Sequence, residues 1–338
     1  MLAQIPAYRA GRPSPDESLK LSSNENPFAP LPGVVQEATA QLGRVNRYPD
    51  AGSAALYDAL ARHHDVAPDR LVAGTGSVAV LYTLLTAFCG PGDEVVMPWR
   101  SFEAYPIGVA LTGATVVPVP LRPDATHDVE AMIAAVTPRT KVLLVCTPNN
   151  PTGPVVTSDQ LTTLLDAVRS DVLVVVDEAY VEFVRHPAAA SGPDELGRDN
   201  VVVLRTFSKA YGLAGLRVGY GIGAEPVIEA VRRASTPFGV TDVAQAAAVA
   251  SLGETDALRD RVDAVVAERD RMVEALRSMG WDVPDAQGNF VWLPAGDRAL
   301  DVAAACQPVS VRPFAGEGVR VTVGTAAAND RLLEALGL

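Results

Sequence analysis

Cysteine and histidine are scarce in this chain, which has three cysteines and four histidines among its 338 residues. Cys89, Cys146 and Cys306 are far apart and match no metal-binding or redox spacing, and the histidines are equally scattered. We therefore predict no metal site. The cysteines are expected to be buried thiols in a reducing compartment, which favours a cytoplasmic location.

Long apolar runs and an excess of positive charge are also missing. No stretch approaches about 18 uninterrupted apolar residues, the length that a membrane-spanning helix needs, and the N-terminus lacks the apolar core of a signal peptide. The 28 basic and 40 acidic side chains give a net charge of −12. Nucleic-acid binding requires a basic face, so neither a nucleic-acid partner nor a membrane is expected.

What the chain has is ample core material, since 48% of its residues are hydrophobic. Short β-branched apolar runs alternate with helical patterns over residues 35–235. We predict strands at 71–73, 94–97, 115–119, 141–146, 172–176, 201–204 and 218–222, and helices at 53–63, 77–88, 129–136, 159–168 and 226–234. This alternation predicts an α/β fold with one mostly parallel sheet of about seven strands and helices on both faces.

The pattern changes after Pro237, which predicts a second domain. One long amphipathic helix is expected over 254–279, ending at Gly280, followed by strands at 289–293 and 319–323 and further short helices. We therefore expect a smaller α+β domain over 236–338. Residues 1–34, rich in proline, serine and asparagine, are expected to form an N-terminal arm rather than a domain.

Two loops of the predicted large domain are suited to binding a polar ligand. Gly76 and Ser77 lie in a glycine-rich turn between a strand and a helix, where backbone amides can bind an anion, although such turns are also common without a ligand. Asn150 lies in a turn at 147–153 that follows a strand. Because ligands bind at the carboxyl ends of parallel strands, this turn is a candidate site, but it also fits a simple structural turn.

Two charged side chains add to these loops. Asp177 ends the apolar run 174–176, where a buried carboxylate needs a cationic partner, either a ligand or a protein arginine. Lys209, flanked by hydroxyl-bearing residues, follows another strand, and Arg217 comes eight residues later. Taken together and in this order, these groups meet the needs of pyridoxal phosphate, which requires an amine, an acid, donors to its phenolic oxygen and a phosphate cup.

At these residues the sequence resembles the fold-type I pyridoxal-phosphate aminotransferases. It is most similar to the histidinol-phosphate aminotransferase branch and its aromatic amino acid (phenylalanine) aminotransferase relatives. The resemblance runs from residues 21–27 through 46–50 to 318–324, and the stretch 205–219 is its most diagnostic part.

The resemblance implies roles for individual residues. Lys209 would be the catalytic amine that forms the imine with pyridoxal 5'-phosphate, and Asp177 would pair with the pyridine nitrogen. The other cofactor-binding residues it implies are Gly76, Ser77, Phe102, Asn150, Tyr180, Thr206, Ser208, Arg217 and Tyr48, of which Tyr48 would reach the phosphate of the neighbouring subunit in a homodimer with shared sites. The substrate-binding residues it implies are Tyr8, Asn24, Arg312 and Arg320, with Arg320 clamping the substrate carboxylate.

The resemblance also implies the reaction, a transamination in which a 2-oxo acid, expected to be 2-oxoglutarate, accepts the amino group. For the donor, Phe238 stands where some histidinol-phosphate enzymes have a phosphate-contacting tyrosine, and residues 99–106 and 311–314 look more like the aromatic relatives. An aromatic amino acid is therefore favoured, with histidinol phosphate as the alternative. The same scaffold also hosts decarboxylases, and a transcription regulator would need a DNA-binding domain that this chain has no room for.

Overall fold

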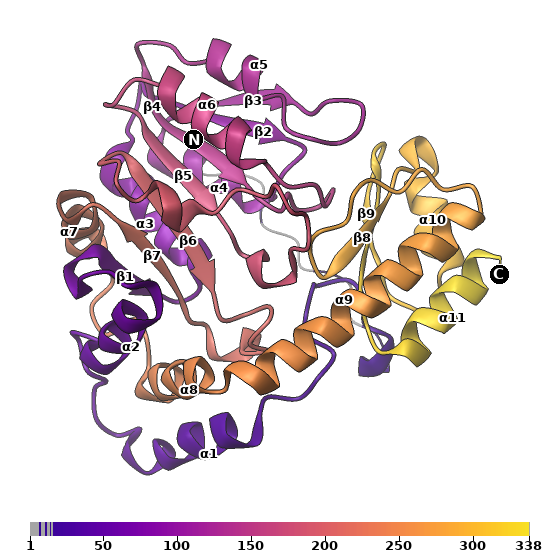
Figure 1. The fold of residues 1–338 in the computed structure, drawn as a ribbon, viewed down its shortest axis with the longest axis horizontal. Coiled ribbons are helices and arrows are strands. Elements are labelled where there is room, and N and C mark those ends of the chain that lie inside the picture. Colours follow the sequence, from indigo (N-terminus) through magenta and orange to yellow (C-terminus); the bar gives the residue numbers. More distant parts are fainter. Residues whose placement is uncertain (1–6, 8–10, 12–13, 15, 338) are drawn as a thin grey trace.

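The computed structural model describes residues 7, 11, 14 and 16–337, and its largest element is a seven-stranded sheet (Figure 1). The strands lie in the order β1-β7-β6-β5-β4-β2-β3. They are β1 (Leu71–Gly74), β2 (Glu94–Trp99), β3 (Thr115–Pro120), β4 (Thr140–Cys146), β5 (Leu173–Asp177), β6 (Val201–Thr206) and β7 (Gly219–Gly223). Neighbouring strands from β3 across to β6 run parallel, so the predicted mostly parallel sheet is confirmed.

Strand β7 is the exception, because it runs antiparallel to both β6 and β1. Its glycines alternate with Tyr220 and Ile222 and therefore lie on one face of the sheet. A Cβ atom on Gly219 would lie 2.3 Å from the backbone nitrogen of Ser77. Only glycine at this position lets the start of helix α3 (Ser77–Phe88) lie directly against the strand.

Helices cover both faces of this sheet, as predicted. Successive strand residues point to opposite faces, so Val174 and Val176 join one core while Val175 joins the other. The first core includes α2 (Ala54–His64), α5 (Val129–Ala134), α6 (Ser158–Ala167) and α8 (Asp242–Gly253), and the second includes α3, α4 (Ala104–Thr112) and α7 (Glu225–Ala234). Burial on both faces explains why the strands are continuous apolar runs.

A smaller body of the chain lies beside the large sheet (Figure 1). Its antiparallel sheet has the order β8-β10-β9 and is flanked by two short helices. These elements are β8 (Phe290–Leu293), β9 (Arg312–Phe314), β10 (Gly318–Thr322), α10 (Ala299–Ala305) and α11 (Ala326–Leu336). They enclose a separate hydrophobic core, which agrees with the expected α+β character of this region.

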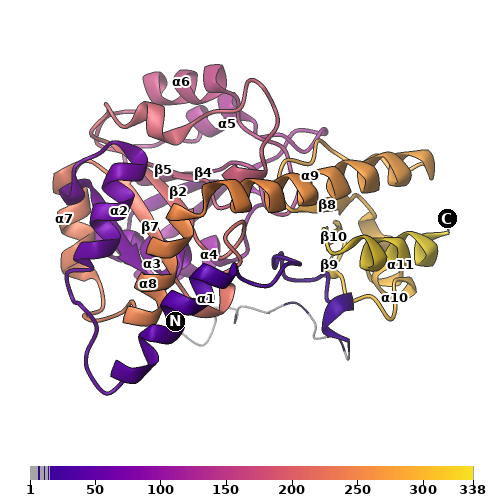
Figure 2. The ribbon, with the colours of Figure 1, turned by 60° about the horizontal axis from the view of Figure 1, so that its bottom comes forward.

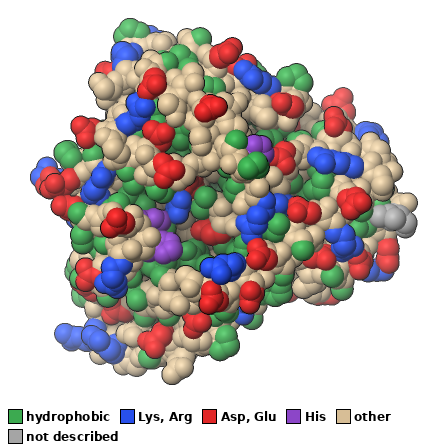
Figure 3. All heavy atoms as spheres, in the orientation of Figure 1, with side chains coloured by type: hydrophobic (Ala, Val, Ile, Leu, Met, Phe, Trp, Pro, Cys, Tyr) green, Lys and Arg blue, Asp and Glu red, His purple; other side chains and the backbone are tan. Residues whose placement is uncertain are grey.

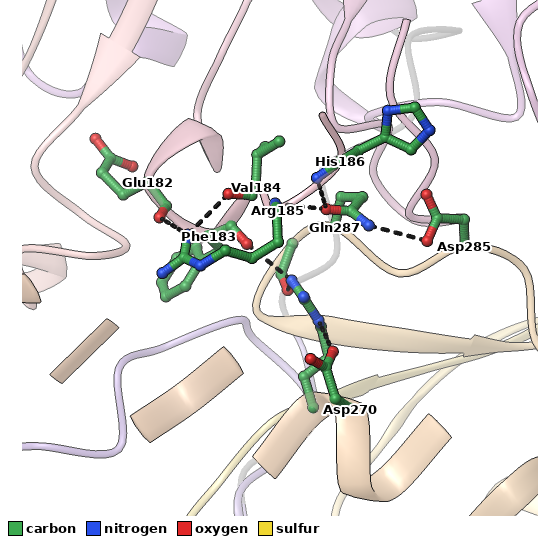
Figure 4. A network of polar contacts seen from close by, with 10 residues as sticks. Glu182, Phe183, Val184, Arg185, His186, Asp270, Asp285 and Gln287 are labelled. Atoms are coloured by element: carbon green, nitrogen blue, oxygen red, sulfur yellow. Dashed lines mark hydrogen bonds and ion pairs between the residues drawn. The ribbon is translucent and has the colours of Figure 1, made fainter. Parts of the chain in front are cut away.

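Helix α9 (Thr255–Ser278) joins the two bodies and runs from α8 to the small sheet (Figure 2). Its Arg269 is 2% exposed and donates a hydrogen bond to the backbone oxygen of Phe183 over 2.9 Å. Close by, the Gln287 side-chain oxygen accepts hydrogen bonds from the backbone nitrogens of Arg185 and His186, at 2.8 and 3.1 Å (Figure 4). These contacts fasten the segment after β5 to the small body.

Packing contacts cross both expected boundaries of the large domain, and the division at residues 35–235 stays a prediction. Buried alanines of α8 belong to the core of the large sheet, and α1 (Pro32–Ala40) packs against α8, although the expected boundary lies at residue 236. Leu21, within the expected arm, packs in the core of the small body. The backbone of its neighbour Lys20 forms an isolated parallel β-bridge with Ser310. Helix α8 thus packs with the large body, and Leu21 packs with the small one.

No helix in the described part of the chain is both long and apolar enough to cross a membrane. On the face shown in Figure 3, acidic and basic side chains are interspersed rather than gathered by sign.

Candidate active site

A cavity of about 510 Å³ lies where the carboxyl ends of the parallel strands meet the small body. Most of the predicted site residues line it together. They are Gly76, Ser77, Phe102, Asn150, Asp177, Tyr180, Thr206, Ser208, Lys209, Arg217, Arg312 and Arg320. Residues from β5, β6, β9 and β10 and the loops after them thus converge on one space.

The amine of Lys209 lies within reach of the N-terminal segment. Its Nζ is 3.4 Å from the backbone oxygen of Ser23, 3.3 Å from that of Asn24, and 5.6 Å from the ring centre of Tyr180. Burial, followed by the positive charge of Arg320, lowers the pKa of Lys209 to about 7. A large fraction of this amine is therefore neutral, and able to act as a nucleophile or base, near neutral pH.

Asp177 places a carboxylate at the end of β5 on the same cavity. One carboxylate oxygen accepts a hydrogen bond from the Tyr105 hydroxyl over 2.8 Å, and the other accepts from the backbone nitrogen of Ala179 over 3.2 Å. Burial raises the pKa of Asp177 to about 6, against the opposing effect of the Tyr105 hydrogen bond. Both groups that donate to Asp177 here are uncharged, so a cationic ligand group would form a favourable ion pair with this carboxylate.

An anion cup lies at the start of α3. Gly76 caps this helix with φ at 90°, and no side chain caps its first backbone amides. Arg217 donates to the Ser208 hydroxyl over 3.4 Å, and Thr206 donates to that same hydroxyl over 3.0 Å. A Cβ atom on Gly76 would lie 2.6 Å from the Arg217 guanidinium, so glycine leaves the room that an anion at the helix start requires.

Asn150, Arg320 and Tyr180 occupy the side of the cavity that faces the small body. Arg320 on β10 donates to the side-chain oxygen of Asn150 over 2.6 Å and to the backbone oxygen of Ser22 over 2.8 Å. Asn24 lies behind this wall, where its side-chain nitrogen donates to the Tyr180 hydroxyl over 3.0 Å. Asn24 therefore contacts a residue that lines the cavity. Its contact with the substrate stays a prediction.

One predicted residue, Tyr48, does not line this cavity. Tyr48 is 81% exposed and stacks on Phe238, with 4.7 Å between ring centres, beside a separate hollow. Its predicted role involves a second subunit and stays a prediction. Tyr8 lies outside the described residues.

Sequence reasoning missed Tyr105, because a tyrosine in the apolar segment of α4 reads as a core residue. The signal that could have found it is its hydroxyl, since a buried tyrosine hydroxyl usually needs a hydrogen-bond partner. Its position three residues after Phe102 also puts the two rings together, 5.6 Å apart. Among the described residues no group of three histidine, cysteine, aspartate or glutamate side chains is placed to hold a metal ion.

Comparison with known proteins agrees with this geometry. An aromatic amino acid aminotransferase of Streptomyces avermitilis is 55% identical over 98% of this chain and 94% of its own length. The corresponding protein of Streptomyces coelicolor is 53% identical over the same shares. The crystal structure of histidinol-phosphate aminotransferase from Sinorhizobium meliloti in complex with pyridoxal-5'-phosphate has a TM-score of 0.87 and 28% identity, covering 94% of this chain and 89% of that chain.

The match also extends to a whole family. Residues 16–336 match the family model described as aminotransferase class I and II. This range contains both sheets and most of the residues that line the cavity. Because nearly the full chain matches this model and relatives above 50% identity cover 98% of it, the chain belongs to the class I and II aminotransferases.

Proposed function

We propose that this chain transfers the amino group of an aromatic L-amino acid to a 2-oxo acid, with pyridoxal 5'-phosphate as its cofactor. The observation that carries this proposal is one cavity that Lys209, with a pKa of about 7, shares with the Asp177 carboxylate and the uncapped start of α3. The aromatic donor is supported by the names of the relatives at 55% and 53% identity.

The cavity residues fit this cofactor, whose aldehyde, ring nitrogen, phenolic oxygen and phosphate each need a different partner. Lys209 would hold the aldehyde carbon, and Asp177 the protonated ring nitrogen. Asn150 and Tyr180 would donate to the phenolic oxygen, and Phe102 would lie against the ring. The phosphate would be held by Gly76, Ser77, Thr206, Ser208 and Arg217, where the missing Cβ of Gly76 leaves space beside the guanidinium.

When bound, the cofactor supplies an electron sink that weakens the bonds of the substrate carbon bearing the amino group. The Nζ of Lys209, released when the donor's amino group replaces it at the aldehyde carbon, would then take the proton from the substrate carbon, and its lowered pKa would leave it neutral for this role near pH 7. Arg320 would hold the substrate carboxylate with two parallel hydrogen bonds, for which the planar guanidinium is suited. The Tyr105 hydrogen bond favours the ionised form of Asp177, which would keep the ring nitrogen protonated.

Histidinol phosphate is the second candidate donor. A solved structure with TM-score 0.87 is a histidinol-phosphate aminotransferase, and Arg312 and Arg320 both bring positive charge to the cavity. The higher identity of the relatives named for aromatic substrates favours the aromatic donor.

A homodimer with shared sites belongs to the same proposal. Large apolar side chains are exposed in the segment before α1, on α1, in the turns after it and in the loop before α8, and exposed apolar patches mark association surfaces. They are Phe28, Val35, Leu42, Val45, Tyr48 and Phe238. Tyr48, the most exposed of them, would reach the phosphate of the partner's site.

The acceptor and the compartment complete the proposal. We expect 2-oxoglutarate to accept the amino group, as the resemblance implies. A cytoplasmic location is supported by Cys89, Cys146 and Cys306, which are all free thiols in the structure.

The test is a panel of amino donors. The rates of three donors, phenylalanine, tyrosine and histidinol phosphate, are compared, each with 2-oxoglutarate as the acceptor. Release of carbon dioxide is measured in the same reactions. We expect phenylalanine and tyrosine to give the highest kcat/KM, with no carbon dioxide. Lys209→Ala is the control and should show no turnover with any donor.

Two results would contradict the proposal at different levels. A strong preference for histidinol phosphate would overturn the aromatic donor but keep the reaction. Stoichiometric carbon dioxide, or full activity of Lys209→Ala, would overturn transamination itself.

A further inference from the structure

One buried asparagine lies behind two of the residues that line the cavity. Asn149 is 1% exposed and directly precedes Asn150, and the residues that line the cavity include Asn150 but not Asn149. No step of the proposed reaction involves Asn149 itself. A buried amide has to satisfy its donors and its acceptor within the protein, so its partners show what it holds in place.

The Asn149 side chain makes three hydrogen bonds, and they reach two separate loops. Its nitrogen donates to the backbone oxygen of Arg100 over 3.0 Å and to the Thr152 hydroxyl over 2.7 Å. Its oxygen accepts from the Ser101 hydroxyl over 2.7 Å. Arg100 and Ser101 belong to the loop after β2, and Thr152 belongs to the loop after β4. One side chain therefore ties together two loops that follow neighbouring strands of the sheet.

The first of these loops carries an aromatic ring of the cavity. Phe102 directly follows Ser101 and lines the cavity, where its ring would lie against the ring of the cofactor. Ser101 is 0% exposed, so its hydroxyl is enclosed on the side of the loop that faces Asn149. Holding Ser101 in this way also holds the backbone from which Phe102 projects.

The second loop carries Asn150, which would donate to the phenolic oxygen of the cofactor. The Asn150 side-chain oxygen accepts a hydrogen bond from Arg320 over 2.6 Å, so its nitrogen is the end that can donate to a ligand. The backbone of Asn149 closes the turn that follows. Its nitrogen donates to the backbone oxygen of Pro154, and its oxygen accepts from the backbone nitrogen of Gly153, both over 2.8 Å. The place of Asn150 therefore depends on the residue before it.

Resting on the cofactor-dependent function proposed above, we infer that Asn149 is a positioning residue that sets the places of Phe102 and Asn150 against the cofactor. Phe102 would contact the face of the cofactor ring and Asn150 its phenolic oxygen. An amide that ties their two loops together fixes both contacts at once. Groups that contact a reacting ligand need to be held to within about 0.5 Å, and neighbouring buried hydrogen bonds provide this precision.

The test is Asn149→Ala, and it is read from the absorbance of the bound cofactor rather than from turnover. This absorbance changes with pH as the nitrogen that joins the cofactor to Lys209 gains or loses a proton. A donor at the phenolic oxygen stabilises the negative charge that remains after this nitrogen is deprotonated, so a displaced Asn150 should raise the midpoint. We expect the midpoint to rise by about half a pH unit or more.

The affinity for pyridoxal 5'-phosphate provides a second readout of the same variant. Titration of the cofactor-free protein with pyridoxal 5'-phosphate should show binding that is about tenfold weaker, as loss of well-placed buried hydrogen bonds predicts. Asn150→Ala gives the reference, because it removes the donor itself, and its midpoint should rise at least as far as that of Asn149→Ala.

The matched control is Asn329→Ala in α11 of the small body. Asn329 is 0% exposed, and its side chain also makes three hydrogen bonds, two with the backbone of Gly324 and one with Glu268. It is not among the residues that line the cavity. Both variants should lose resistance to urea in the cofactor-free state, but only Asn149→Ala should move the absorbance midpoint. An equal shift in Asn329→Ala would overturn the inference, because lost stability alone would then be the cause.

A milder variant decides the question if Asn149→Ala does not fold. Ser101→Ala removes one hydroxyl and leaves the two hydrogen bonds that the Asn149 nitrogen donates. It should raise the midpoint and weaken cofactor binding by smaller amounts. A folded Ser101→Ala protein with an unchanged midpoint and unchanged affinity would then overturn the inference.

The failures can be told apart. If the unsubstituted protein binds no pyridoxal 5'-phosphate and gains no visible absorbance, the proposed function itself is wrong. If it binds the cofactor but folded Asn149→Ala keeps both the midpoint and the affinity, the function stands and the role of Asn149 is wrong.

Discussion

Lys209 owes its chemistry to its surroundings rather than to its own structure. Burial and the cation of Arg320 lower its pKa from 10.5 to about 7, so that the amine loses its proton as the pH rises through about 7. In the cofactor-free protein we expect acetylation of this amine by acetic anhydride to be slow at pH 5 and to rise with a midpoint near 7. Mass spectrometry of the digested protein gives the rate at each pH.

A second variant separates the two causes. Arg320→Gln removes the neighbouring charge but leaves the burial, so the midpoint should move upward and remain below that of a solvated lysine. A midpoint near 10.5 in the unsubstituted protein would contradict the lowered pKa.

For single residues, the sequence located charged side chains that directly follow a strand. It did not reveal side chains whose partners are distant in sequence. Asp177 and Lys209 stand next to apolar runs, where a charge is conspicuous, and both line the cavity. The hydrogen bond from Tyr105 to Asp177 joins residues 72 positions apart, and nothing local marks it. Glu103 likewise reads as an ordinary exposed acid until its partner, Arg312, is brought across from the small body.

At the scale of single elements, α9 depends on one buried arginine. Replacing Arg269 by methionine leaves the backbone oxygen of Phe183 without this donor in a buried place. We expect the free energy of unfolding to fall by about 2 to 3 kcal/mol, the cost of an unsatisfied buried group together with a lost charged hydrogen bond. Urea unfolding followed by circular dichroism measures the loss.

Arg271, two residues further along α9, provides the comparison. Its side chain is 41% exposed and pairs with Glu268 and Asp330. Arg271→Met should cost less than about 1 kcal/mol, as exposed ion pairs usually do. Equal losses in the two variants would mean that the burial of Arg269 is not what makes it important.

The elements themselves were predictable where their periodicity was pronounced. The β-branched runs of the large sheet and the amphipathic stripe of α9 were located from the sequence to within a few residues. The antiparallel direction of β7 was not, because strand direction depends on how the chain returns to the sheet. The packing of α8 on α1 was also missed, since its alanine-rich surface has little amphipathic contrast.

At the scale of the whole molecule, the exposed apolar surface around Tyr48 predicts self-association. Replacing Tyr48 by alanine removes its stack with Phe238 and part of that surface. We expect the dissociation constant of the dimer to rise about tenfold or more, as for a central aromatic contact. Sedimentation velocity over a dilution series gives the constant.

Leu300→Ala is the matched control, because Leu300 is 55% exposed and lies on α10 of the small body, whereas Tyr48 lies beside residues of α1, α2 and α8. It should leave the association unchanged. A protein that sediments as a monomer without any substitution would contradict the proposed dimer.

The contact between Gly219 and the first turn of α3 has a consequence for how such a protein can change. The anion cup depends on two positions, Gly76 and Gly219, where a Cβ atom would meet Arg217 or the backbone of α3, so substitutions there disturb the fold as well as the site. The cavity wall at Phe102 and Arg312 is formed by side chains instead. Mutational libraries aimed at new donors should therefore leave the cup untouched and diversify that wall, where adaptation to a new substrate can proceed without rebuilding the anchor.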